Sequence, residues 1–138
     1  MKYMILTYAS QRDYDGMAGL GGEEPAWAPE DFAAMGEFMT RFNADLEASG
    51  ELVETRGLAA PAETYRLGAR DGVPFVTDGP YAETEEVLAG YWIIDVPSLE
   101  RAREIAARLA DTPAPAHVRN RAYADIRPII ESRQDILD

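Results

Sequence analysis

Val87–Asp95 constrains the fold most, because this segment carries apolar side chains on both of its alternating faces. One face holds Val87, Tyr91 and Ile93, and the other holds Leu88, Trp92 and Ile94. A strand of this kind is normally covered on both sides in a folded protein. The sequence therefore predicts a central β-strand with a packed layer on each face.

Two segments show the spacing of amphipathic helices. Residues 29–49 begin with Pro29, which suits the first helical position, and repeat apolar side chains at three- and four-residue steps: Phe32, Met35, Met39, Phe42 and Leu46. Residues 98–110 begin at Ser98, a favourable N-cap, and carry a second stripe: Leu99, Ala102, Ile105, Ala106 and Leu109. We interpret both stripes as core-packing faces. A binding groove is the alternative for the stripe of Met and Phe.

The other segments are β-rich or loop-like. Strands are expected at 2–9, 51–58, 63–69, 74–77 and 117–130, and loops at 10–28 and 79–86. Helices separated by a block of strands favour an antiparallel sheet with both helices on one face. The predicted fold class is thus α+β, with a ferredoxin-like arrangement.

Such a sheet leaves its second face bare, whereas Val87–Asp95 requires cover there. A second copy of the chain is the simplest cover, because most oligomers of soluble proteins are symmetric dimers. We therefore expect a homodimer in which two sheets form a dimeric α+β barrel. The space enclosed between them is a candidate site for a small molecule.

One domain of residues 1–130 is expected, followed by a polar tail at 131–138. No apolar run approaches the roughly 20 residues that span a bilayer, so no membrane association is expected. The opening residues, Met1–Leu6, have the composition of a strand and not of a signal peptide. These features predict a cytoplasmic location.

Charge and residue usage exclude several functions. The net charge of −12 disfavours direct binding to nucleic acid or to anionic membranes. The chain has no cysteine and a single histidine, His117, which argues against thiolate nucleophiles and the usual zinc sites. We therefore expect no metal site and no cofactor. His117 itself is an acid–base candidate, although a lone histidine before a strand is more often incidental.

Residues 76–95 read VTDGPYAETEEVLAGYWIID, a run centred on Asp78-Gly79-Pro80-Tyr81. It resembles the signature of the DGPF branch of YCII-related proteins, and the two ends of the chain resemble that family as well. Tyr81 stands where Phe is usual, Glu85 where Lys is common, and Ala89 where a first Gly is common.

The resemblance implies a ferredoxin-like fold that pairs into a dimeric α+β barrel. It also implies a link to extracytoplasmic-function sigma factors. Some YCII-related proteins are proposed to be enzymes that use a His–Asp pair with the histidine on the first helix. Residues 29–49 contain no histidine, so that pair cannot be transferred to this chain.

Asp78 and Glu83 are the candidate catalytic residues. A carboxylate at a cavity mouth can act as a general base when burial raises its pKa. The alternative is structural: Asp-Gly-Pro forms a turn, since Asp bonds nearby backbone, Gly permits positive φ and Pro fixes the exit.

The candidate substrate-binding residues are Tyr81, Trp92, Arg119, Arg121, Tyr123 and Arg127. If residues 117–130 form one strand, the arginines and Tyr123 share a face that suits an anionic ligand. The alternative is a solvated edge strand whose charges prevent aggregation.

Two functions follow from these observations. The first is binding of a small polar molecule at the dimer cavity, with acid–base transformation as an extension. The second is a non-catalytic module that acts on a protein partner such as a sigma factor.

Overall fold

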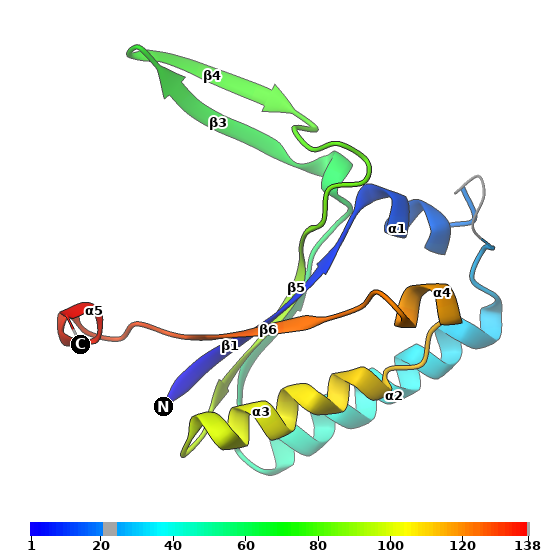
Figure 1. The fold of residues 1–138 in the computed structure, drawn as a ribbon, viewed down its shortest axis with the longest axis vertical. Coiled ribbons are helices and arrows are strands. Elements are labelled where there is room, and N and C mark those ends of the chain that lie inside the picture. The colour runs from blue at the N-terminus through cyan, green and yellow to red at the C-terminus, as the bar shows by residue number, and fades with distance from the viewer. Residues whose placement is uncertain (21–24, 138) are drawn as a thin grey trace.

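A computed structural model describes residues 1–20 and 25–137 (Figure 1). The main sheet contains β1 (Lys2–Ala9), β2 (Leu52–Gly57), β5 (Val87–Asp95) and β6 (Ala124–Pro128). Its strand order is β2-β5-β1-β6, and all neighbours are antiparallel. With α2 (Pro29–Ala48) after β1 and α3 (Leu99–Ala107) after β5, this is the predicted ferredoxin-like α+β arrangement.

Both long helices lie on one face of the sheet, as predicted (Figure 1). Helix α2 begins at Pro29, and the Asp31 carboxylate accepts a hydrogen bond from the Ala28 backbone N–H at 2.8 Å. Helix α3 begins after Ser98, whose side chain accepts from the Arg101 N–H at 3.1 Å. These contacts satisfy backbone donors that the first helical turn leaves unpaired.

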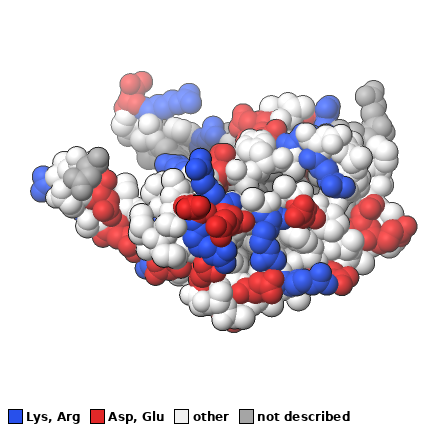
Figure 2. Space-filling view, turned by 60° about the horizontal axis from the view of Figure 1, so that its bottom comes forward, with Lys and Arg blue, Asp and Glu red and all other residues white. Residues whose placement is uncertain are grey.

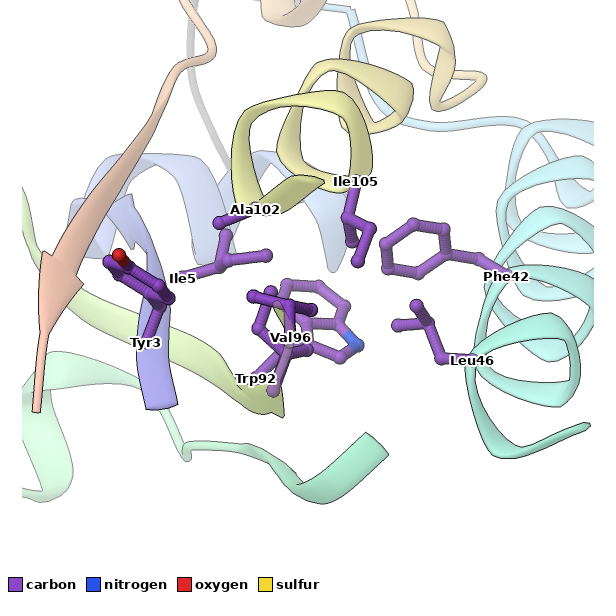
Figure 3. Close-up of a cluster of buried hydrophobic side chains, with 9 residues drawn as sticks. Tyr3, Ile5, Phe42, Leu46, Trp92, Val96, Ala102 and Ile105 are labelled. Carbon is purple, nitrogen blue, oxygen red and sulfur yellow. The ribbon is translucent and has the colours of Figure 1, made fainter. Parts of the chain in front are cut away.

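The core lies between this face and the two helices (Figure 3). The sheet contributes Tyr3, Ile5, Trp92 and Ile94, and the helices contribute Phe42, Leu46, Ala102 and Ile105. Trp92 meets Phe42 edge to face at 5.5 Å between ring centroids and donates from Nε1 to Asn43 Oδ1 at 2.8 Å. The buried indole therefore has both an aromatic neighbour and a polar partner.

The opposite face of the sheet is the open face, which we define by the side chains that alternate with the core residues. Its centre holds four apolar or aromatic residues from β1 and β5, namely Met4, Leu6, Tyr91 and Ile93. Charged residues surround them: Lys2, Glu54, Arg56, Asp95, Asp125 and Arg127. Val87–Asp95 is thus covered on one face by helices, and within this chain α2 and α3 leave the other face uncovered (Figure 1).

The other two predicted strands form a separate hairpin, which we call the arm. Strands β3 (Tyr65–Arg70) and β4 (Val73–Asp78) pair only with each other. They turn through Asp71 and Gly72, which both have positive φ. The arm projects from the body on the side away from α2 and α3 (Figure 1).

Two predictions about local structure were wrong. Residues 10–28 were expected to be a loop, but α1 occupies Gln11–Met17. Ser10 and Asp13 form a reciprocal capping box that starts this helix despite the Gly16 near its end. The remainder of the expected loop includes residues 21–24, which lie outside the described residues.

The strand expected at 117–130 is interrupted as well. Helix α4 (Ala116–Arg119) follows Pro115, and β6 begins only at Ala124. Pro115 accepts hydrogen bonds at its carbonyl from the N–H groups of Val118 and Arg119, so the chain turns before it extends. Shorter elements complete the chain: η1 (Pro61–Glu63), η2 (Arg108–Asp111) and α5 (Arg133–Leu137) in the expected tail.

Ion pairs tie the helical layer to the sheet. Arg101 on α3 forms a two-pronged contact with Glu51, next to β2, through Nε–Oε2 and Nη2–Oε1 distances of 2.8 Å. Figure 2 turns the side of α2 and α3 toward the reader and shows acidic and basic side chains intermingled across it. No described helix is long and apolar enough to cross a bilayer.

Replacing Phe42 with Ala tests the importance of the core. Phe42 is fully buried against Trp92, and we expect the free energy of unfolding to fall by about 3–5 kcal/mol. Urea denaturation followed by tryptophan fluorescence measures the change. The exposed Phe32→Ala is the matched control, and an equal loss in both variants would contradict the assignment of Phe42 to the core.

Glu51→Gln tests the pair with Arg101. The hydrogen bonds from Arg101 lower the pKa of Glu51 to about 2. Since this pKa is lower in the folded than in the unfolded chain, the stabilisation is present above the ordinary pKa of 4.5 and is lost as pH falls toward 2. Thermal melts should give a higher melting temperature for wild type than for Glu51→Gln at pH 6. The difference between the two melting temperatures should become smaller by pH 3. Glu37 is exposed, so Glu37→Gln should melt at the wild-type temperature at both pH values. A difference for Glu51→Gln that does not change with pH would contradict the link between stability and the ionisation of Glu51.

Candidate functional site

A cavity of about 470 Å³ opens at one end of the space between the sheet and the helices. Its walls come from the end of β1, from α1, α2, α3 with η2, and from the α4–β6 connection. The stripes that fill the core continue into it. On α2, Phe42 and Leu46 are core residues, while Met35 and Met39 line the cavity.

The lining is mainly apolar. It includes Met17, Trp27, Met35, Met39, Leu109 and Val118. Methionine side chains adapt to irregular shapes, and the alanines of α3 leave room beside them. The predicted stripe of Met and Phe is therefore both a core face and, at its methionine end, a cavity wall.

Polar groups form the rest of the lining. Asp13 accepts from Arg121 Nη2 through Oδ1 at 2.6 Å and from the Ser10 backbone N–H through Oδ2 at 2.8 Å. One carboxylate thus starts α1 and also holds the segment after α4. Arg119 also lines the cavity and is solvent-exposed.

Two stacked tyrosines stand beside these charges. The Tyr8 and Tyr123 rings lie 5.3 Å apart between centroids. Burial raises the pKa of Tyr8, and a hydrogen bond to Asp125 raises it further. Burial also raises the pKa of Tyr123, with the Glu86 carboxylate adding to the effect. Both phenols are therefore neutral near pH 7, and their hydroxyls already donate to carboxylates, that of Tyr8 to Asp125 and that of Tyr123 to Glu86.

This set of groups suits binding through shape and hydrogen bonds. An apolar wall accepts the body of a ligand, and Arg119 can donate to its polar end, with the stacked rings of Tyr8 and Tyr123 beside it. In residues 1–20 and 25–137, no three His, Asp or Glu side chains are placed to hold a metal ion.

Comparison with known proteins agrees with this fold. The model of the YCII-related domain matches residues 1–127. The chain belongs to the YCII-related family. The uncharacterized protein R00369 of Rhizobium meliloti (strain 1021) is 29% identical over 86 residues, which cover 62% of this chain and 69% of that protein.

In this YCII-related chain, three predicted binding residues line one cavity: Arg119, Arg121 and Tyr123. They do so from the α4–β6 connection and not from one face of a strand, because residues 116–119 are helical. Arg127 lies on β6 next to Ile126, which packs against the core, and opposite Met4, so it faces the open side of the sheet.

Trp92 is not a lining residue. It is 7% exposed and belongs to the core beside Phe42. The alternation of apolar residues in β5 predicted cover on both faces, and within this chain the helices cover only the face of Trp92 and Ile94.

Asp78 and Glu83 lie outside the cavity lining. Asp78 is exposed at the last residue of β4, opposite Tyr65 at the base of the arm. Glu83 pairs with Arg12 at 3.5 Å. The Arg66 guanidinium lies over the Tyr81 ring at 5.2 Å from its centroid, and Gly79 N–H donates to Thr64 O at 2.8 Å. The Asp-Gly-Pro-Tyr run therefore closes the base of the arm.

Sequence reasoning missed Tyr8, Asp13 and Glu86 as lining residues. The spacing Ser10-x-x-Asp13 was the available signal, because a Ser followed by an acid three residues later marks a helix start. No local pattern places Glu86 near Tyr123.

Asp13→Ala tests the double role of this carboxylate. The variant loses both the α1 cap and the Arg121 contact, so we expect the free energy of unfolding to fall by about 1 kcal/mol. Asp15→Ala, on the same helix but bonded to Gln11, is the matched control. Urea titrations compare them, and a loss in Asp15→Ala as large as that in Asp13→Ala would contradict the role of Asp13.

Proposed function

We propose that this chain binds a small molecule in the cavity, with an apolar body against the methionines and an anionic end toward Arg119. The observation that supports this most is the combination of a cavity of about 470 Å³ with an apolar wall and a few polar groups. Small-molecule sites of roughly 300–1,000 Å³ commonly have this composition.

Arg119 is the lining charge that favours an anion, because Asp13 is paired with Arg121 and Glu86 accepts a hydrogen bond from Tyr123. Arg119 forms no ion pair with any residue that the structure describes, so its guanidinium is available to a carboxylate or similar group. Tyr8 and Tyr123 add a stacked aromatic surface beside it. The ligand is thus a small amphipathic anion, held within one protomer.

Several finer predictions are part of this proposal. We assign the chain to the DGPF branch, place it in the cytoplasm, and expect a homodimer that forms an α+β barrel through the open faces. Asp78 and Glu83 are proposed acids for any acid–base step, at a site that the second copy would complete.

The alternative is a module that binds a protein such as an extracytoplasmic-function sigma factor. The net charge of −12 favours it, because an acidic surface attracts a basic partner. A salt-sensitive complex with such a purified factor, together with an empty cavity in the probe experiment below, would support this alternative.

Binding of 1-anilinonaphthalene-8-sulfonate tests the cavity. The probe combines aromatic rings with one sulfonate and fluoresces in apolar surroundings. We expect saturable binding that Arg119→Ala weakens about tenfold, since it removes a charge-assisted contact. Ala110→Trp should abolish binding by filling the space, with circular dichroism confirming that the variant is folded.

The matched control is Arg103→Ala, which removes an exposed arginine of α3 outside the lining. It should bind the probe like wild type. Equal losses in both arginine variants, or unchanged binding in Ala110→Trp, would overturn the proposal.

A further inference from the structure

Each strand of the arm has one edge without a neighbouring strand. Strands β3 and β4 pair only with each other, so among the described residues no strand lies along the outer edge of either one (Figure 1). All six residues of β3 are exposed. Backbone N–H and C=O groups on such an edge can accept another strand, and folded proteins usually protect them with a proline, a bulge or a charge.

The other strand edges in the described part of the chain carry a proline or a bulge. Pro74 lies within β4. On the main sheet, the edge strand β2 has an irregular register between Leu52 and Glu54, and the edge strand β6 ends at Pro128. Strand β3 contains no proline, and its pairing with β4 runs without a register shift. The outer edge of β3 is therefore the most open of these edges.

The register shows which backbone groups of β3 point outward. Hydrogen-bonded and non-hydrogen-bonded pairs alternate along an antiparallel ladder. Pro74 opposes Ala69 and has no N–H, so this pair is of the non-hydrogen-bonded kind. Two residues along, Leu67 and Val76 form a pair of the same kind. The N–H and C=O groups of Tyr65, Leu67 and Ala69 therefore point away from β4, toward the free edge.

The base of the arm holds this edge in place. Gly79 N–H donates to Thr64 O at 2.8 Å, which continues the ladder beyond β3 and β4. Ala62 N–H donates to Gln11 Oε1 at 2.7 Å, so α1 braces the chain just before β3. A two-stranded hairpin is marginally stable in water, and three strands with an apolar face are needed for independent stability. One further strand on β3 would thus complete the arm.

One face of the arm is apolar except at its base. Cross-strand pairs share a face, which places Tyr65, Leu67 and Val76 together, with Asp78 at the base. Tyr65, Leu67 and Val76 are 65%, 72% and 65% exposed. A strand added to β3 would cover Tyr65 and Leu67 with its own side chains on this face. Those side chains should therefore be apolar.

The other face of β3 carries two positive charges. The Arg66 guanidinium lies over the Tyr81 ring at 5.2 Å from its centroid, and that of Arg70 over the Phe75 ring at 5.1 Å. Neither arginine forms an ion pair with any residue that the structure describes. An added strand would place two of its own side chains next to them, because Arg66 and Arg70 share one face of β3. Acidic side chains there would supply the missing charge partners.

We propose that the outer edge of β3 binds an extended acidic segment of a partner protein, which joins the arm as a third strand. The segment alternates, with apolar side chains beside Tyr65 and Leu67 and carboxylates beside Arg66 and Arg70. Backbone hydrogen bonds to β3 give the affinity, and the alternating side chains give the specificity. The inference goes beyond the proposed small-molecule site, since none of these residues lines the cavity.

Charge argues against a second copy of this chain at the same edge. Two β3 strands paired antiparallel about a two-fold axis would bring Arg66 and Arg70 of both copies onto one face, and like charges on neighbouring strands destabilise a sheet. An acidic segment replaces this repulsion by attraction. The net charge of −12 repels acidic partners from most of the surface, so the two arginines also restrict such a segment to this edge.

Calorimetric titration of the full-length chain with a synthetic peptide tests the proposal. The probe is the acetylated and amidated peptide EVTVEV, which has the predicted alternation. We expect saturable binding that Leu67→Pro weakens at least about tenfold, because the variant loses an outward N–H and puts a proline ring in its place. Ala69→Pro, opposite Pro74, repeats the test at a second outward N–H.

The matched control is Val76→Pro. Val76 lies directly opposite Leu67 on β4, and the outer edge of β4 already contains Pro74. This variant should bind the peptide like wild type, and circular dichroism shows that each variant is folded. No binding to wild type, or equal losses in folded variants of the two strands, would overturn the proposal.

A charge-reversed peptide tests the acidic character of the partner. RVTVRV should bind wild type at least about tenfold more weakly than EVTVEV, and the order should reverse when Arg66→Glu and Arg70→Glu are combined. Equal affinities for the two peptides overturn the acidic partner. Sedimentation tests the other occupant: a wild-type dimer that Leu67→Pro dissociates and Val76→Pro does not would assign this edge to a second copy and overturn the proposal.

Discussion

The contact between Trp92 and Phe42 joins the two layers on which the rest of the structure depends. Trp92 stands on β5, next to the centre of the sheet, and Phe42 lies midway along the apolar stripe of α2. The bond from the indole to Asn43 fixes the ring in place. Beyond this point the same stripe continues with Met39 and Met35, and there the layers separate into a cavity.

The cavity is therefore a continuation of the core that side chains do not fill. Its apolar wall comes from the packing stripes, and its polar lining comes from segments that enter from either side of the sheet. Asp13 connects these segments, because it starts α1 and holds Arg121. The start of α1 and the position of the α4–β6 connection are thus coupled through one carboxylate.

Particular residues show how far sequence reasoning reached. The stripes on residues 29–49 and 98–110 correctly predicted two helices on one face, because a 3.6-residue period in apolar side chains requires an apolar neighbour. Residues 117–130 were misread, since an alternating pattern cannot distinguish a strand from a short helix that ends in a turn. Arg119, Arg121 and Tyr123 line one cavity, but they do so from the α4–β6 connection and not from one face of a strand. Trp92 was assigned to a site, although its face of β5 lies under the helices.

The sequence alone determined the α+β class and the family, because these depend on local periodicity and on a contiguous motif. Only the tertiary structure decided that residues 65–78 leave the sheet as an arm and that Tyr8, Asp13 and Glu86 meet the arginines at one cavity. The physical reason is that such meetings depend on how far the packed layers extend and where they separate. No local pattern of residues shows where the helical layer and the sheet separate.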